Sequence, residues 1–141
     1  MKKLISKILL ITVIITFSNT VNAESNYYNN GKNFFDKKNY KKAKFYFEKD
    51  IVFNPKSEKS YLYLAKIFKI EDKNSLEENN LNTTILLNPK NEEAIYNLVL
   101  LNIKKSNFSK SKELIKTFDK VCKTMCSSKK TLQEKLNNSK K

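Results

Sequence analysis

The stretch that decides the fold is YYNNGKNFFDKKNYKKAKFYFEKDIVFNP at residues 27–55, because its pattern recurs as YLYLAKIFKIEDKNSLEENNLNTTILLNP at residues 61–89. Aligning the two closing prolines gives a period of 34 residues and pairs Tyr27 with Tyr61, Gly31 with Ala65, Phe34 with Phe68, and Phe47 with Leu81. A third register continues without a proline through Ile95, Leu98, Ser111, Ile115 and Phe118. A period of this length is typical of stacked repeats that bury a shared core.

The apolar spacing inside each repeat predicts helices. Tyr40, Ala43, Phe47 and Ile51 recur at intervals of three or four residues, which places them on one helical face. One Gly and two Pro are also too few turn formers for a many-stranded sandwich or barrel. We therefore expect an all-α fold, an α-solenoid of three antiparallel helix-turn-helix hairpins within residues 24–126, at about residues 24–57, 58–91 and 92–125.

An early aromatic residue, a small residue four positions later and a closing proline, repeated every 34 residues, resemble the tetratricopeptide repeat. The signature positions are filled by Tyr27, Gly31, Phe34, Ala43, Phe47 and Pro55 in the first repeat, by Tyr61, Leu64, Ala65, Phe68, Leu81 and Pro89 in the second, and by Ile95 and Leu98 in the third. The resemblance implies that small residues let the paired helices approach closely. Departures occur at Asn30, Asp50, Glu77, Asn102 and Lys123. At Glu77 we expect either a splayed helix pair or a glutamate stem that runs outward to water.

Polar residues before the apolar stripes predict where helices begin. Ser57 and Asn91 are expected N-caps, and Ser109 is expected to open the sixth helix. Residues 127–141 predict a basic C-terminal capping helix or tail. Ser128 would cap a helix there, Thr131 and Glu134 resemble a capping box, and Leu132 and Leu136 share a face; the alternative is a frayed Lys/Asn tail.

The N-terminus predicts export. Lys2, Lys3 and Lys7 precede ten uncharged residues at 8–17, and Val21-Asn22-Ala23 supplies a small-residue cleavage site. This pattern is typical of a secretory signal peptide at residues 1–23, with cleavage after Ala23. The alternative, an uncleaved membrane anchor, needs about 20 apolar residues to span a bilayer. We expect a periplasmic or secreted protein, favour a bacterial source, and expect no transmembrane span after cleavage.

Catalytic chemistry has few candidates. The absence of His removes His-based nucleophile systems and HExxH metal sites. The acidic pairs at 71–72, 77–78 and 92–93 consist of adjacent residues, which do not face each other on a helix. We expect no enzyme activity, no cofactor and no metal site.

Cys122 and Cys126 are the two cysteines of the chain. In an oxidising compartment they suggest a disulfide, but residues four apart in a regular helix are poorly aimed for one. Either the helix ends between them and a disulfide forms, or they are two semi-buried free thiols.

A binding surface is the best candidate for function. In tetratricopeptide repeats, the first helix of each pair lines a concave groove. The resemblance carries this role to Tyr28, Lys32, Phe35, Lys59, Leu62, Lys66, Lys69, Glu93, Tyr96, Leu100 and Ile103. Family members that clamp a C-terminal carboxylate use Lys and Asn where this chain has Tyr28 and Lys32. Aromatic and lysine side chains in a groove suit an extended acidic peptide. The alternative is that the lysines are simply solvated and the tyrosines pack within the hairpins.

Charge is concentrated at one end of the chain. The formal net charge is +14 with 28 Lys and no Arg, and an A/T-rich genome is one cause of such a composition. Residues 24–103 carry 13 Lys against 11 acidic residues, whereas residues 104–141 carry 12 Lys against 3. We therefore expect a non-catalytic protein-interaction module or assembly adaptor. The alternative is an electrostatic binder of an anionic envelope surface through the basic C-terminal region. Nucleic acid is not an expected partner, because no Arg is present for bidentate contacts.

Overall fold

A computed structural model describes residues 26–139 of the chain. The predicted signal peptide, its cleavage site after Ala23 and the last two residues lie outside this part. The described residues form seven helices and no strand: α2 (Asn26–Asp36), α3 (Tyr40–Phe53), α4 (Glu58–Ile70), α5 (Asn74–Leu87), α6 (Glu92–Lys104), α7 (Phe108–Val121) and α8 (Ser128–Asn138). The predicted all-α, helical-repeat fold is confirmed.

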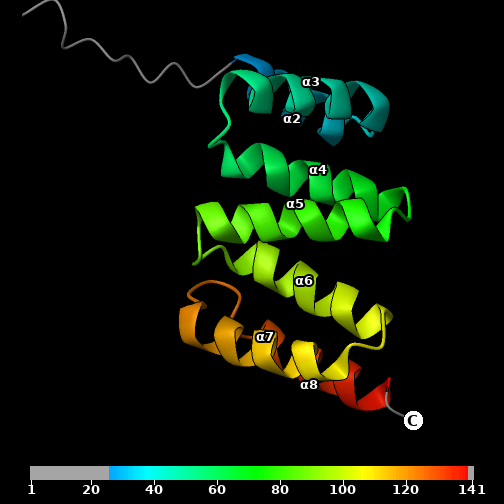
Figure 1. Ribbon diagram of the computed structural model, residues 1–141, viewed down its shortest axis with the longest axis vertical. Coiled ribbons are helices and arrows are strands. Elements are labelled where there is room, and N and C mark those ends of the chain that lie inside the picture. The colour runs from blue at the N-terminus through cyan, green and yellow to red at the C-terminus, as the bar shows by residue number, and fades with distance from the viewer. Residues whose placement is uncertain (1–25, 140–141) are drawn as a thin grey trace, which may run out of the picture.

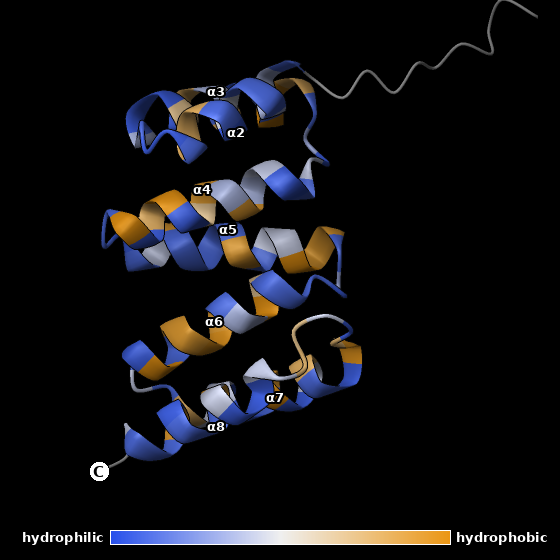
Figure 2. Ribbon diagram, turned by 180° about the vertical axis from the view of Figure 1, so that it is seen from behind, coloured by the Kyte–Doolittle hydropathy of each residue, from blue (hydrophilic) through white to orange (hydrophobic). Residues whose placement is uncertain are grey.

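The helices stack in the order of the sequence. Figure 1 shows α2 and α3 at one end, α4 and α5 next, then α6, with α7 and α8 together at the other end. The inner helices α4 and α6 carry longer apolar stretches than α7 and α8, as Figure 2 shows. This difference accords with packing, because α4 contacts α2, α3 and α5, and α6 contacts α5, α7 and α8, whereas α7 and α8 contact mainly each other and α6 within the described residues. No helix within residues 26–139 is long and apolar enough to span a membrane.

The three turns within the hairpins have the same geometry at the same 34-residue period. Lys38, Asp72 and Ser106 each adopt a left-handed conformation with φ of 57–58°. The next residue of each turn donates its N–H across the turn, and these three hydrogen bonds are Asn39 to Phe34, Lys73 to Phe68 and Asn107 to Asn102, at 2.8–2.9 Å. This is the helix C-cap bonding pattern of the Schellman motif. The third hairpin thus keeps the repeat's backbone although its sequence has drifted.

The connections between hairpins follow the two prolines. Helices α3 and α5 end at Phe53 and Leu87, two residues before Pro55 and Pro89, because proline disfavours helical backbone in the residue that precedes it. Asn91 caps α6 as predicted, its side chain accepting from the Ala94 N–H at 2.9 Å.

Two other predicted caps differ in detail. Ser57 precedes α4, but its hydroxyl donates to Ser60 at 3.1 Å instead of accepting from the helix backbone. The prediction that Ser109 opens the sixth helix is wrong by one residue, since α7 begins at Phe108 after Asn107.

Gly31 shows why the first hairpin needs a small residue. A Cβ built on Gly31 would lie 2.7 Å from the Phe47 ring, inside van der Waals contact. Eight other signature residues are buried: Ala43, Phe47, Leu64, Ala65, Phe68, Leu81, Ile95 and Leu98. Tyr27, Phe34 and Tyr61 are half-buried at the margins, and Pro55 and Pro89 are exposed in the connections.

The C-terminal segment is a helix that completes the core. Leu132 and Leu136 of α8 are buried in one cluster with Ile95, Val99 and Phe118. The frayed-tail alternative is therefore wrong for residues 128–138, because two leucines one turn apart give this segment an apolar face to bury. The capping-box prediction is also wrong, because Thr131 lies inside α8 and Ser127 precedes its first residue.

Candidate binding surface

The first helices of the three hairpins, α2, α4 and α6, carry the residues predicted to line a groove. We call the surface bearing these residues the groove face. Side chains link α4 to α6 across this face. Lys66 Nζ lies 2.5 Å from Glu93 Oε1, and Lys69 Nζ donates to Asn97 Oδ1 at 3.0 Å. These two lysines are therefore held by the neighbouring helix, which corrects the simplest reading of them as freely solvated.

Aromatic side chains gather at the N-terminal end of the groove face. The Tyr63 ring lies 5.0 Å from the Phe35 ring, 5.9 Å from the Tyr28 ring and 4.9 Å from the Phe47 ring, centroid to centroid. Lys66 extends over the Tyr63 ring at 4.6 Å. The resemblance selected Leu62 and missed Tyr63 beside it. The aromatic side chain was the available signal, since Tyr63 is half-buried and joins α2, α3 and α4.

Three predicted groove residues lie elsewhere or are engaged locally. Leu62 is 7% exposed and packs in a core cluster with Leu81 and Leu98, so it offers little surface to a ligand. Tyr96 packs toward α7, with its ring 6.2 Å from that of Phe118. Lys32 pairs with Asp36 one turn along α2 at 2.6 Å, and this hydrogen bond raises the pKa of Lys32.

The C-terminal half of the groove face contains a pocket of about 640 Å³, which we call the lysine-rimmed pocket. Its lining combines lysines, aliphatic residues and other polar residues in equal number: it comprises Lys69, Lys104 and Lys135, then Leu100, Leu101 and Ile103, and finally Glu77, Asn138 and Ser139. The pocket brings together predicted groove residues from α4 and α6 with side chains of α5 and α8. Of the residues predicted for the groove, Lys69, Leu100 and Ile103 line it.

Glu77 is the carboxylate of the lysine-rimmed pocket. It is 3% exposed, so the expectation that its stem runs outward to water is wrong. Nor is the helix pair splayed, because Ala65 and Leu81 pack in one buried cluster. Burial raises the pKa of Glu77, while the charges of Lys69 and Lys104 oppose the rise. Lys104 is itself held by an ion pair with Asp72 and by a hydrogen bond of 2.9 Å to Asn74 Oδ1.

A second, smaller pocket of about 220 Å³ lies where α3 ends and α4 begins, and we call it the Asp50 pocket. It is lined by Tyr28, Asp50, Asn54, Lys56, Ser57, Glu58 and Lys59. Asp50 is fully buried and accepts a hydrogen bond of 2.5 Å from the Ser60 hydroxyl at Oδ2. Within residues 26–139, Asp50 Oδ1 has no hydrogen-bond partner. The Lys59 ammonium lies 5.5 Å from the centroid of the Tyr28 ring.

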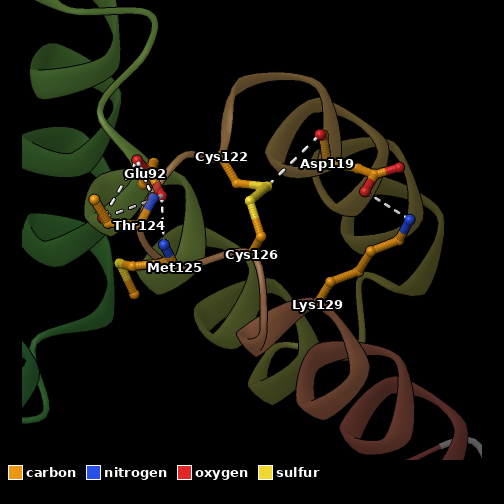
Figure 3. Close-up of a disulfide and its surroundings, with 7 residues drawn as sticks. All are labelled: Glu92, Asp119, Cys122, Thr124, Met125, Cys126 and Lys129. Atoms are coloured by element: carbon orange, nitrogen blue, oxygen red, sulfur yellow. Dashed lines mark hydrogen bonds and ion pairs between the residues drawn. A yellow bond between two sulfur atoms is a disulfide. The ribbon is translucent and has the colours of Figure 1, made fainter.

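Helix α7 ends at Val121, before both cysteines, so the geometric condition for a disulfide is met. The structure joins Cys122 to Cys126 with a Cα–Cα distance of 5.2 Å. Figure 3 shows the carboxylate of Glu92, at the start of α6, facing the loop that the disulfide closes. Glu92 accepts from the N–H groups of Met125 at 2.8 Å and Thr124 at 3.1 Å, and these hydrogen bonds lower the pKa of Glu92. The described residues contain no group of three side chains suited to a metal ion.

The basic C-terminal region divides into paired and unpaired lysines. Lys105 pairs with Glu78, and Lys129 pairs with Asp119 at 2.6 Å. Along α7, by contrast, Lys112, Lys116 and Lys120 are exposed at four-residue spacing, with no ion pair among the described residues. We call these three residues the α7 lysine stripe.

The stacked hairpins, their repeated turns and the groove face define a helical-repeat fold of the tetratricopeptide type. No protein-family model matches the sequence, and no curated protein is significantly similar to it.

The fold is similar to three solved structures. The Yersinia enterocolitica type III secretion translocator chaperone SycD matches with a TM-score of 0.75 and 11% identity, covering 89% of this chain and 90% of SycD. SycD of that organism in complex with a peptide of the translocator YopD matches at 0.72 and 12% identity, covering 86% and 97%. A CopN–Scc3 complex contains a chain that matches at 0.65 and 16% identity, covering 79% of this chain and 66% of that one. At these identities the likeness establishes the fold.

Proposed function

We propose that this protein is a non-catalytic adaptor or chaperone whose groove face binds a segment of another protein. The single observation that carries the proposal is the lysine-rimmed pocket, whose lining combines three aliphatic side chains with three lysines. An apolar side chain would pack against the aliphatic residues, and a nearby carboxylate would meet the lysines. The partner segment we propose is therefore apolar and acidic.

The structural neighbours support this class of function. SycD is described as a translocator chaperone and has been solved with a peptide of YopD, and Scc3 has been solved with CopN. Their shared fold presents side chains of several helices on one face, which suits an extended segment.

The test is capture of the partner from a native envelope extract by immobilised protein. Lys69→Glu reverses a charge at the pocket rim, and Leu100→Asp places a charge in the apolar lining. Each has a matched control on another surface: Lys116→Glu on α7, and Leu86→Asp at a leucine that is 80% exposed. We expect both pocket variants to lose the captured partner and both controls to keep it. Capture that survives Lys69→Glu and Leu100→Asp would overturn the proposal.

The second candidate function is electrostatic binding to an anionic envelope surface, and the α7 lysine stripe favours it. Lysines near a charged surface contribute up to about 1 kcal/mol each, and salt screens that contribution. Reversing Lys112, Lys116 and Lys120 together would then abolish binding to vesicles of anionic lipid, whereas Lys69→Glu would not.

We further propose that the protein is exported and processed after Ala23. The basic start, short apolar segment and small-residue site within residues 1–23 support this. Expression of the full chain in a bacterial host should yield a periplasmic or secreted product. Its measured mass should match a chain that begins at Glu24. A product that retains residues 1–23 would contradict cleavage.

A further inference from the structure

We propose that the Asp50 pocket is a binding site for a primary ammonium group. The proposal concerns a different pocket from the one assigned to the partner segment, and its test does not require that partner. Its basis is a fully buried carboxylate that lines a pocket and lacks a partner for one of its two oxygens.

Asp50 is held in position by one oxygen, and its other oxygen is buried without a hydrogen-bond partner among the described residues. The Ser60 hydroxyl donates to Oδ2 at 2.5 Å. The Ser57 hydroxyl donates in turn to Ser60 at 3.1 Å, which fixes that serine. Oδ1 receives no hydrogen bond within residues 26–139. Because an unpaired buried carboxylate oxygen is costly, a ligand that donates to it gains more than it would in water.

Packing alone does not require a carboxylate at this place in the fold. One period later, the positions of Asp50 and Ser60 are occupied by Thr84 and Ala94, both fully buried. Thr84 satisfies its hydroxyl within its own helix, by donating to Asn80 O at 2.9 Å. The second repeat therefore packs the same junction without a charge, and the Asp50–Ser60 pair is a specific addition to the first junction.

The surroundings of Asp50 identify the ligand as a cation with N–H donors. Glu58 also lines the pocket, and its Oε2 is buried and lacks a hydrogen-bond partner among the described residues. Two carboxylates, each with a buried oxygen that lacks a donor among the described residues, suit a group that carries positive charge and several donors, which an ammonium provides. Lys56 and Lys59 contribute positive charge to the same lining, and the Tyr28 ring stabilises the Lys59 ammonium through a cation–π contact.

The test is titration of ¹⁵N-labelled protein with n-butylammonium chloride, followed by amide chemical shifts. This probe represents a lysine side chain, and glycinamide hydrochloride in a parallel titration represents a protein N-terminus. We expect at least one probe to give saturable shifts at Tyr28, Ser57 and Ser60. The probe that binds more tightly shows whether the site prefers a lysine side chain or a protein N-terminus. Neutral 1-butanol and sodium chloride at equal concentration should give no saturable shifts there.

Asp50→Asn is the decisive variant, because it keeps the shape of the side chain and removes the negative charge of the carboxylate. Binding should weaken by about tenfold or more, the effect of losing a hydrogen bond between charged groups. Glu48→Gln on the exposed side of α3 removes an equal charge and should leave binding unchanged. If Asp50→Asn fails to fold, Glu58→Gln provides the same comparison. Equal affinity in the pocket variant and the wild type, or equal shifts with 1-butanol, would overturn the proposal.

Discussion

Gly31 and Glu77 are both buried in hairpins, but the space beside each residue differs. At Gly31 the neighbouring Phe47 ring fills the space that a side chain would need. At Glu77 the equivalent place, one period after Ala43, accepts a carboxylate because a pocket adjoins it. The two positions therefore follow different local rules, because a ring adjoins Gly31 whereas a pocket adjoins Glu77.

Gly31→Ala should destabilise the protein despite alanine's higher helix propensity. Alanine gains about 1 kcal/mol of propensity, but the new Cβ would lie 2.7 Å from Phe47, and such overpacking costs about 1–3 kcal/mol. The Phe47 ring has little room to move, since it is fully buried and stacks on Tyr63 at 4.9 Å. We expect a net loss of up to about 2 kcal/mol in the free energy of unfolding by urea. Asn29→Ala, exposed on the same helix, is the control and should not destabilise.

Glu77→Gln should stabilise the protein more at neutral pH than in acid. Burial raises the pKa of folded Glu77 above its ordinary value of 4.5, so the folded state holds the proton more tightly than the unfolded state. Wild-type stability therefore falls as pH rises from the ordinary pKa through the raised one, whereas glutamine does not titrate. Urea midpoints at about pH 4 and about pH 8 measure this, with Glu134→Gln as an exposed control. A stability difference between Glu77→Gln and wild type that is equal at both pH values would contradict the assignment.

At the scale of elements, the three hairpin turns and the α7–α8 connection show two ways to end a helix. Each hairpin turn relies on a non-glycine residue in the left-handed region, at Lys38, Asp72 and Ser106. The α7–α8 connection instead uses a disulfide and the Glu92 carboxylate, which accepts from two backbone N–H groups of the loop. The hairpin turns repeat because the backbone hydrogen bonds repeat, even where the side chains differ.

Lys38→Gly should stabilise the first hairpin turn. A left-handed conformation costs a non-glycine residue about 1 kcal/mol, and glycine avoids this cost. Because Lys38 is exposed and has a φ of 57°, we expect the free energy of unfolding to rise by up to about 1 kcal/mol. Lys37→Gly, one residue earlier, should have the opposite sign, since there glycine adds only backbone freedom. Destabilisation by both changes would show that the turn differs from the structure.

Reduction of the Cys122–Cys126 disulfide should weaken the connection to α8. The closed loop is short, with a sequence separation of 4, so the entropic model gives a loss of about 2 kcal/mol. The native protein should gain no mass on thiol alkylation without reductant and should gain two adducts after reduction and unfolding. An alkylated product from the untreated protein would contradict the bond.

At the scale of the molecule, the core is a chain of neighbouring clusters. The cluster at the α2–α3 end, with Phe47 and Ile67, shares no buried residue with the cluster at the α7–α8 end, with Phe118 and Leu132. The cluster of Leu62, Leu81 and Leu98 lies between them. Stability should therefore vary along the stack, as expected for repeats that contact only their neighbours.

Phe47→Ala and Phe118→Ala should unfold opposite ends of the molecule. Each phenylalanine is fully buried, so each truncation costs about 3–5 kcal/mol. In amide hydrogen exchange, Phe47→Ala should reduce protection mainly in α2 and α3, and Phe118→Ala mainly in α7 and α8. The same loss of protection along the whole chain in both variants would instead show a single cooperative unit.

The helical-repeat fold follows from the sequence. The 34-residue recurrence of aromatic, small and proline residues predicts the hairpins because apolar spacing and turn-compatible residues act locally. Local patterns also predicted the Asn91 cap, and the resemblance to tetratricopeptide repeats named Lys69, Leu100 and Ile103 for the groove. Which of these residues meet depends on how the helices pack. Packing buries Leu62, turns Tyr96 toward Phe118, joins Tyr63 to three helices and closes the lysine-rimmed pocket with α8.

The physical reason is that a pocket depends on how helices from different repeats pack. Periodicity places a side chain on a helical face, but burial and pairing depend on the neighbour that this face meets. Asp50 illustrates the difference. In the sequence it is a departure from the repeat pattern, and only the packing of α3 against α4 gives it Ser60 as a partner and leaves its second oxygen buried without a hydrogen-bond partner among the described residues.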